Sequence, residues 1–459
     1  MAVHTKDMTH GNPTKLIIMF CLPIIVGSLF QQLYSLVDTL VIGRLEGVTA
    51  LSAVSSAGWL DWTVLGLAMG LAQGFSIQIA QSFGAGDMTG LRKAAGQSLL
   101  LSALAVVVLE AGSQLLLTPV LRLMNTPADT FALTSQYLRI IFGGIVLVMG
   151  FNLFSGFLRA MGDSRTPLIA MTTAALCNMA LDVVFVAYFR WGVKGVATAT
   201  VISQGISCLI CLAALFRQPV MRLKAGDFRP DSGMIVRLAR LGIPVAFQNL
   251  VISVGGLVLQ SVVNSRGFIF MAGYSAASRL QGLIELAGTS VGSAVGTFAG
   301  QNIGAGRLDR VRLGLRRSAQ LAVGLAVLVA GVMILWGKPL LRLFIEDDPL
   351  IVDQVLTFGY RFLVVMSAGV SMLYLLFVYR ATLQGLGDTF IPMLSGGIEL
   401  VMRISAALLL PLFMGEWGVY LAEILAWIAA AILLMVGYYR RIRFMEARVR
   451  REDKPLPNA

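Results

Sequence analysis

Charged residues are scarce in this chain. Asp, Glu, Lys and Arg together make up 13% of the 459 residues, while hydrophobic residues make up 57%. An ordinary soluble domain carries about a quarter of its residues as charged side chains. The low charge therefore excludes a typical soluble protein and indicates an integral membrane protein.

Histidine is nearly absent, which limits the chemistry that the chain can perform. The two histidines, His4 and His10, precede the first long apolar segment, and no His-Glu-x-x-His element occurs. An integral-membrane enzyme would need a nucleophile, a metal cluster or paired catalytic acids near an interface. We therefore expect a protein that is not an enzyme and that carries no cofactor.

Cysteine is also rare, and its positions do not indicate a disulfide scaffold. The spacing of Cys208 and Cys211 resembles that of a redox or metal motif, but both residues fall in the middle of an apolar segment. We interpret all four cysteines as small apolar core residues: Cys21, Cys177, Cys208 and Cys211.

Long apolar segments, by contrast, run through the whole chain. Each is long enough to cross a bilayer, which takes about 20 helical residues. They are too long and too uniformly apolar to be barrel strands. We predict an all-α integral membrane protein with about twelve transmembrane helices. The spans lie near 15–42, 50–82, 93–120, 133–158, 167–190, 193–216, 237–263, 272–300, 316–337, 355–381, 390–414 and 417–439.

The sequence repeats itself after roughly 220 to 226 residues. The segment 81–86 recurs as 301–306, Gly162-Asp163 recurs as Gly387-Asp388, and the tripeptide at 191–193 recurs at 417–419. Such a duplication is typical of transporters whose site lies between or within the repeats. We predict two pseudo-symmetric six-helix lobes, residues 1–230 and 231–459.

Lys and Arg concentrate in every second connection, including the runs within 217–240 and 307–317, and in the C-terminal tail at 440–451. Short basic loops stay in the cytoplasm, so we predict a multi-pass protein of the cytoplasmic membrane with both termini inside. The net charge of +12 follows this rule, and nucleic-acid binding is not expected. We expect the short tail before Lys15 to be disordered or bound at the membrane surface.

A few polar residues lie inside the apolar spans, where a charge costs at least about 2.5 kcal/mol. Gln31, Tyr34 and Asp38 share one helix face, and Asn178 and Asp182 share another at a spacing of four. Thr200 follows the turn near Trp191 by about as many residues as Asp182 precedes it, so the depths of Thr200 and Asp182 should match.

Asp38, Asn178, Asp182 and Thr200 can therefore share one pocket. These oxygens suit Na⁺, and the carboxylates could hold a proton instead. The alternative is that the residues only join helices by hydrogen bonds.

The other intramembrane acids give weaker indications of a functional site. Glu399 and Arg403 are four residues apart and most simply form an ion pair within one helix. Glu285 could line a cavity of the second repeat, and we keep Glu285 and Glu399 as candidate substrate-pocket acids. Asp61 and Glu423 are interpreted as structural residues that lie near helix ends or pair locally.

The motifs of the chain together resemble the multidrug and toxic compound extrusion (MATE) transporters. The resemblance covers essentially the whole chain and is closer to the DinF-like branch than to the NorM-like branch, because the seventh and tenth spans hold no acids. It rests on Pro23, Gln31-Gln32, Tyr34, Val37-Asp38, Gly84-Ala85-Gly86, Tyr137-Leu138-Arg139, Arg159 to Asp163 with Thr166-Pro167, Asn178 with Asp182, and Gly192-Val193 with Gly195-Val196-Ala197.

The resemblance implies a secondary antiporter that exports cationic or amphiphilic compounds as Na⁺ or H⁺ flows inward, with two lobes rocking around a cleft. It implies a cation site at Asp38, Asn178, Asp182 and Thr200. Surrounding or gating residues would be Pro23, Gln31, Tyr34 and Asn152. We expect a protein that functions as a monomer. The alternative within the wider superfamily is a flippase for lipid-linked precursors, whose cavity should be strongly cationic.

The two repeats differ at the candidate site. Aligned by their shared motifs, Asp38 meets Leu259 and Asn178 meets Arg403. We therefore expect ion coupling in the first repeat and a substrate cavity shaped by the second.

Overall fold

The computed structural model describes residues 5–124, 126–343 and 349–452, which are almost entirely helical and contain no strand. The first half comprises α1 (Pro13–Leu45), α2 (Gly47–Gly84), α3 (Met88–Leu123), α4 (Ala128–Gly143), α5 (Ile145–Ala160), α6 (Arg165–Asp182), the π-helix η1 (Val183–Tyr188) and α7 (Val193–Phe216). The short 3₁₀ turns η2 (Pro219–Met221) and η3 (Ala225–Phe228) lead into the second half.

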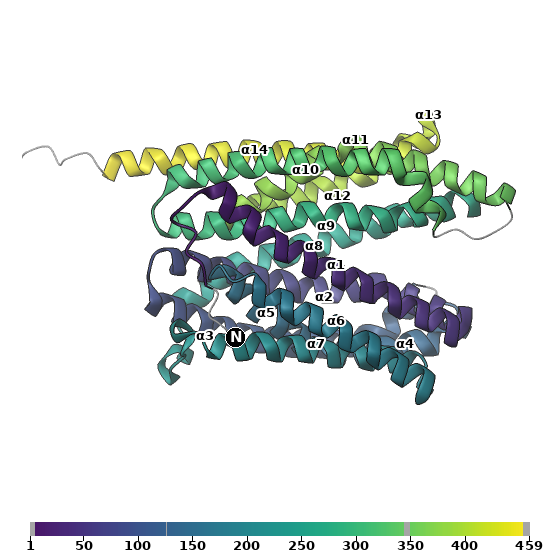
Figure 1. Cartoon of the computed structure of the whole chain (residues 1–459), viewed down its shortest axis with the longest axis horizontal. Helices are drawn as coiled ribbons and strands as arrows, with labels where there is room; N and C mark the ends of the chain where they lie inside the picture. The colour runs from purple at the N-terminus through teal and green to yellow at the C-terminus, as the bar shows by residue number, and fades with distance from the viewer. Residues whose placement is uncertain (1–4, 125, 344–348, 453–459) are drawn as a thin grey trace, which may run out of the picture.

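The second half comprises α8 (Ser232–Asn264), α9 (Phe268–Gly304), α10 (Leu308–Arg342), α11 (Pro349–Gly385), α12 (Phe390–Leu409), α13 (Pro411–Met414) and α14 (Glu416–Glu452). In Figure 1 the helices α2 to α7 form the lower group and α8 to α14 form the upper group, while α1 begins against the upper group, where it contacts α9 and α10, and crosses to α6 of the lower group. The connection between the groups contains the predicted lobe boundary at residue 230, which stays a prediction.

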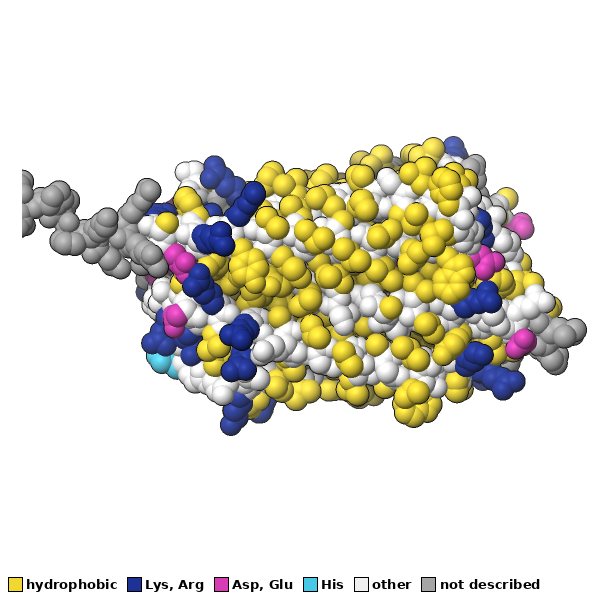
Figure 2. All heavy atoms as spheres, turned by 90° about the horizontal axis from the view of Figure 1, so that it is seen from above, with side chains coloured by type: hydrophobic (Ala, Val, Ile, Leu, Met, Phe, Trp, Pro, Cys, Tyr) yellow, Lys and Arg dark blue, Asp and Glu magenta, His cyan; other side chains and the backbone are white. Residues whose placement is uncertain are grey.

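The helices have the length and composition of membrane spans. Among the described residues, ten helices are long and apolar enough to cross a membrane. The pair α4 and α5, bent by 46° at Gly144, makes an eleventh span. The 37-residue α9 is not among these spans, and it carries Arg279 and Glu285 within its length. Figure 2 shows hydrophobic side chains over the middle of the molecule and charged side chains gathered at its two ends. The predicted all-α membrane fold is confirmed.

The two groups meet along α2 and α8, where glycines, which have no side chain, occupy the contact. A Cβ atom on Gly74 would lie 2.4 Å from the Gly242 Cα atom, and one on Gly70 would lie 2.5 Å from the Ala246 Cα atom. Glycines spaced by four residues therefore let two helix backbones touch, as small residues do in membrane helix pairs.

One end of the bundle, which we call the proximal end, is closed by two equivalent contacts, one from each repeat. It holds the turns that follow α2, α5, α9 and α11. The Gln81 side chain donates to the Gly385 carbonyl at 2.9 Å, and its repeat equivalent Gln301 donates to the Ala160 carbonyl at 2.8 Å. Gly84 packs on the Gln301 backbone and Gly304 packs on the Gln81 backbone, with no room for a Cβ atom on either glycine. The opposite end, with the turns after α1, η1, α8 and α13, is called the distal end.

The N-terminal segment Lys6–Gly11 lies across this seal, so the expectation of a disordered or surface-bound tail is wrong for these residues. Met8 is fully buried, and its backbone N–H donates to the Gln301 side chain at 2.8 Å. Its carbonyl accepts from Asn302 and from Arg310, each at 3.1 Å. The backbone N–H of Lys6 donates to the Met161 carbonyl at 3.2 Å, so the segment contacts both halves of the molecule.

Candidate cation site

The central feature of the first repeat is a pair of aspartates on packed helices. The carboxyl groups of Asp38 in α1 and Asp182 in α6 lie within hydrogen-bonding reach of each other. Asp182 is fully buried. No described residue donates a hydrogen bond to either Asp182 oxygen or to the buried Oδ1 atom of Asp38. Two facing carboxylates repel each other unless a proton or a cation lies between them, so this pair fits one or the other.

Asn178 lies one helical turn before Asp182 and is 1% exposed. Neither its amide nitrogen nor its amide oxygen has a partner among the described residues. A buried amide without partners costs about 1–3 kcal/mol for each unsatisfied group. The unpaired oxygen is a suitable additional ligand for a cation at the carboxylates.

Thr200 lies on the neighbouring helix α7 and is half-buried. Its hydroxyl donates to the Val196 carbonyl at 3.0 Å. Because the proton is used in this bond, the Thr200 oxygen can act only as an acceptor or ligand. The structure thus brings Asp38 and Asp182 together, and the cation-binding role of all four residues stays a prediction.

The backbone changes its winding immediately after Asp182. The π-helix η1 follows, with the Phe189 N–H bonded to the Val184 carbonyl at 3.0 Å. The turn into α7 then passes through Arg190 with φ of 56° and Gly192 with φ of 57°. A π-helical turn is rare and is often found at functional sites. The sequence predicted the turn near Trp191, but no residue pattern predicted the π-helix.

Aromatic and amide side chains surround the pair. Tyr34 lies beside the side chains of Gln31 and Gln204 and near Asp38. The predicted placement of Gln31 and Tyr34 on the face of Asp38 therefore agrees with the structure. Tyr137 of α4 lies near both Asp38 and Asp182. Sequence reasoning did not assign a role to Gln204 or Tyr137, because polar residues alone in apolar spans give no distinct signal.

A third acid lies close to the same site. Asp61 is 14 residues into α2 and near Tyr34 and Tyr137. Its Oδ1 atom is buried and has no partner among the described residues. The interpretation of Asp61 as an acid near a helix end is therefore wrong. Its position in an apolar span, the same signal that singled out Asp38, could have identified it.

Two of the predicted surrounding residues form no hydrogen bond with the Asp182 oxygens or with the Oδ1 atom of Asp38. Pro23 lies about four helical turns before Asp38, so it can act on the pair only through the bend of α1. The Asn152 side chain donates to the carbonyl of Val148 in its own helix at 2.8 Å. The roles of Pro23 and Asn152 stay predictions.

The second repeat holds a buried cluster of ion pairs. Glu399 accepts from Arg380 and from Arg403, each at 2.9 Å, and Arg403 also contacts Glu423 at 3.1 Å. The predicted pair of Glu399 and Arg403 within α12 is present, and it extends to α11 and α14. Because both Glu399 oxygens are held by arginines, this carboxylate is not free to attract a cationic substrate.

Glu285 has a different environment. It is half-buried in α9, and its Oε1 atom accepts from the Gln281 side chain one turn earlier at 2.9 Å. It forms no ion pair with another described residue. Of the two candidate substrate-pocket acids, Glu285 therefore keeps the more available charge, and the assignment of both stays a prediction.

The two repeats differ in how the buried charges at their equivalent positions are balanced. Asn178 aligns with Arg403. In the first repeat two carboxylates face each other without a cation from the chain. In the second repeat the Arg403 guanidinium supplies that cation and is held by two glutamates. The chemical asymmetry expected from the sequence is present in the structure.

One pattern in α9 has the form of a nucleophile motif, Gly288-Thr289-Ser290-Val291-Gly292. It lies in the middle of a continuous helix rather than on a strand-to-helix turn. The Ser290 hydroxyl donates to the Leu286 carbonyl at 2.7 Å, as serine commonly does inside a membrane helix. We interpret this segment as a helix-packing element.

Comparisons with known proteins agree with this arrangement. The MatE family model matches residues 23–184 and 244–409, once in each half. The "Probable multidrug resistance protein YpnP" of Bacillus subtilis is 32% identical over 357 residues, which cover 78% of this chain and 79% of that protein. The "Multidrug export protein MepA" of Staphylococcus aureus is 25% identical over 433 residues, covering 92% of this chain and 93% of that protein.

The fold matches solved structures over almost its full length. The structure described as "Crystal structure of MATE in complex with MaL6" has a TM-score of 0.91 at 23% identity and covers 97% of this chain and 100% of that chain. The membrane-spanning helices, the family match in each half and the named relatives together define a multi-pass membrane transporter rather than an enzyme. The chain belongs to the MatE family. Its closer likeness to the DinF-like branch stays a prediction.

Proposed function

We propose that this protein is a secondary antiporter that exports cationic or amphiphilic compounds, driven by inward flow of Na⁺ or H⁺. The names of its relatives support drug export. The observation that carries the coupling is the pair of Asp38 and Asp182, whose facing oxygens lack donors from the described chain. Such a pair binds a proton or a cation strongly, because the bound charge removes the repulsion between the carboxylates.

Coupling follows if the cation and the substrate favour different states of the first lobe. A ligand shifts a conformational equilibrium only by its difference in affinity for the two states. Binding of a cation draws α1 and α6 together, and its release lets them part. We propose that the two lobes then rock about the glycine contact of α2 and α8, which gives alternating access.

The orientation follows from the basic side chains. Arg307, Arg310, Arg312, Arg316 and Arg317 all lie at or near the proximal end of α10. By the positive-inside rule this end faces the cytoplasm, with both termini inside and the distal end outside. We propose a protein of the cytoplasmic membrane that works as a monomer, and the sealed proximal end corresponds to a state closed toward the cytoplasm.

The flippase alternative is less well supported by the charges. A lipid-linked precursor carries phosphates, so its cavity should present free cations. The two buried arginines of the second repeat, Arg380 and Arg403, are both held by glutamates. The buried atoms left without partners in the first repeat include carboxylate oxygens of Asp38, Asp61 and Asp182. These favour a cationic ligand.

Transport by purified protein in liposomes tests this proposal. Efflux of a fluorescent organic cation is measured under an imposed Na⁺ gradient and, in parallel, under an imposed pH gradient. We expect one of the two gradients to drive efflux, and Asp38→Asn to abolish the effect of that gradient. Glu110→Gln is the matched control, because Glu110 is an intramembrane acid of α3 outside the aspartate pair. Equal efflux with and without either gradient would overturn the proposal.

A further inference from the structure

An apolar layer covers the aspartate pair on its distal side. Ile42 lies four residues beyond Asp38 in α1, and Val186 lies four residues beyond Asp182. Val196 lies four residues before Thr200, in the direction of the same end. The three side chains are 0%, 2% and 0% exposed. With Ala50 and Val193 they form a small core cluster that is separate from the two large cores. We call these five residues the distal plug.

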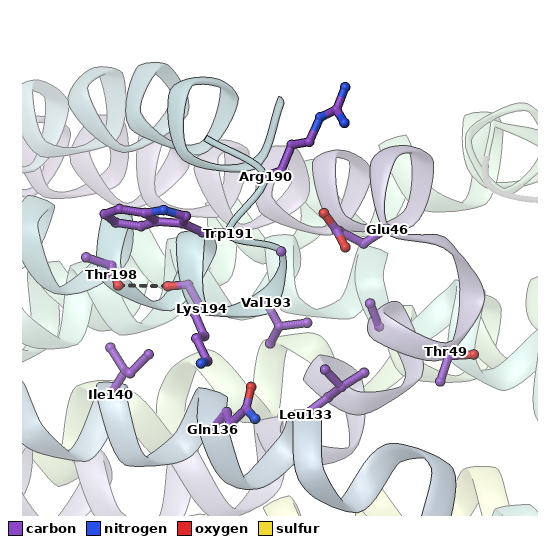
Figure 3. Close-up of a pocket in the computed structure, with 12 residues that line it drawn as sticks. Glu46, Thr49, Leu133, Gln136, Ile140, Arg190, Trp191, Val193, Lys194 and Thr198 are labelled. Carbon is purple, nitrogen blue, oxygen red and sulfur yellow. Dashed lines mark hydrogen bonds between the residues drawn. The ribbon is translucent and has the colours of Figure 1, made fainter. Parts of the chain in front are cut away.

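Beyond the distal plug lies a pocket of about 730 Å³ that is lined by both polar and apolar side chains, among them the plug residues Ala50 and Val193. Glu46 follows Ile42 by four residues, and Gly192 precedes Val196 by four residues, so the pocket lies one further layer toward the distal end. We call it the distal pocket, and Figure 3 shows its lining. The polar lining side chains used in the argument are Glu46, Gln136, Arg190 and Lys194.

The charges of the distal pocket are not neutralised within the structure. Glu46, Arg190 and Lys194 form no ion pair with any other described residue. The Glu46 carboxylate lies against Gly192, where a Cβ atom would be 3.0 Å from its Oε2 atom. In Figure 3 the Lys194 side chain extends toward Gln136, while Arg190 points away from the pocket. The Glu46 carboxylate therefore lies beside Gly192, the residue that precedes the plug residue Val193.

A cation cannot cross the distal plug as it stands. Moving an ion into an apolar layer without polar partners costs far more than thermal energy, and hydrophobic constrictions gate pores in this way. The plug residues come from four segments: α1, the start of α2, the π-helix η1 and the first turn of α7. The π-helix is a rare winding, and Arg190 is a non-glycine residue in the left-handed region, with φ of 56°. Such backbone features are often found at functional and switching sites.

We propose that the distal pocket is the vestibule of the aspartate pair and that the distal plug is the gate between them. A small hydrated cation, Na⁺ or hydronium, would collect in the vestibule beside Glu46 and reach Asp38 and Asp182 when the plug opens. This proposal rests on the proposed function, since it assigns a route to the same site. It assigns roles to Ile42, Glu46 and Val186, which the sequence patterns do not single out.

A cysteine reporter tests the gate. Asn178→Cys is prepared in the full chain in nanodiscs and treated with a positively charged methanethiosulfonate reagent, and the protein without the reporter gives the background of the native cysteines. We expect slow labelling at position 178, because this residue is 1% exposed. Adding Val186→Ala should raise the rate about tenfold, the size expected for removing two buried methyl groups from a packed layer. Ile42→Ala provides a second opening variant if Val186→Ala does not fold.

Val184→Ala is the matched control, because Val184 belongs to the same π-helix and is 41% exposed. It should leave the labelling rate unchanged. Glu46→Gln, made with the opened plug, should slow the cationic reagent several-fold and leave a neutral reagent of similar size unaffected. Equal rates for Val186→Ala and Val184→Ala would overturn the gate, and equal effects of Glu46→Gln on both reagents would overturn the vestibule.

Efflux by the unmodified chain in liposomes, measured alongside the labelling, separates this proposal from the proposed function. If Val186→Ala accelerates labelling while transport by the unmodified chain responds to neither ion gradient, the result supports the gate and contradicts ion coupling. If transport is coupled but labelling is unchanged, the coupling stands and the gate fails.

Discussion

Asp38 and Asp182, which are separated by 143 residues in sequence, bring their carboxyl groups within hydrogen-bonding reach of each other in the first repeat. No described side chain donates to the buried oxygens of this pair. The pair is therefore electrostatically incomplete within the chain, and that incompleteness is the basis of the proposed coupling.

Neutralising one member of the pair should stop coupling without unfolding the protein. In Asp182→Asn the amide can donate to Asp38, which satisfies that carboxylate and removes the repulsion. We expect efflux that no longer responds to the coupling gradient, together with a melting temperature equal to or above that of the unmodified protein. Fluorescence-monitored melting in detergent and the liposome assay measure the two effects. A lower melting temperature with normal coupling would show that the pair is structural.

Breaking the ion cluster of the second repeat should reduce stability strongly. Glu399→Gln leaves Arg380 and Arg403 with one buried carboxylate fewer, and removal of one partner from a buried pair costs about 3–5 kcal/mol. The control is Glu446→Gln, which removes the more exposed ion pair with Arg312 and should cost at most about 1 kcal/mol. Unfolding by a denaturing detergent compares the two variants. Equal stabilities would mean that the buried cluster adds nothing to the fold.

Adding a methyl group between α2 and α8 should disturb the contact between the two halves. In Gly74→Ala the Cβ atom would meet the Gly242 backbone, and overpacking of this kind costs about 1–3 kcal/mol. Gly112→Ala is the control, because nothing lies within 4 Å of its added Cβ atom. We expect a lower melting temperature and slower efflux for Gly74→Ala and no loss for Gly112→Ala. The same behaviour in both variants would contradict a close helix contact.

The sequence predicted the all-α membrane fold because apolar composition and span length are direct consequences of the bilayer. It also predicted that Asp38 and Asp182 belong together, since buried acids are rare enough to be noticed one by one. It did not predict the π-helix after Asp182, which depends on the tertiary packing of α6 and α7 rather than on local residue preference. Nor did it predict the ion pair between Arg380 of α11 and Glu399 of α12, because partners on different helices are set by how the helices pack.

The N-terminal segment is a further case in which tertiary contacts decide the structure. Its sequence is polar and short, so nothing in it indicates burial. Its order comes from Gln301, Asn302, Arg307 and Arg310, which bind its backbone at the proximal end.

Releasing this segment should expose Met8. A cysteine placed by Met8→Cys should react slowly with a water-soluble thiol reagent, because residue 8 is fully buried. Arg310→Ala removes hydrogen bonds to the carbonyls of Met8 and Gly11, and each bond from a charged group contributes about 1.5–3 kcal/mol. We expect at least about a tenfold faster reaction. Arg317→Ala is the control and should have no effect, because Arg317 lies on the same helix and donates to Gln320 rather than to the N-terminal segment.

Release of the bound ion by the substrate tests the central claim most directly. Purified protein in weakly buffered detergent is mixed with an exported organic cation, and the Na⁺ or H⁺ set free is measured. We predict about one ion released for each protein molecule and none from Asp182→Asn, because substrate and ion favour different states of the first lobe. Release of neither ion, or equal release from the unmodified protein and from Asp182→Asn, would contradict coupling at the aspartate pair.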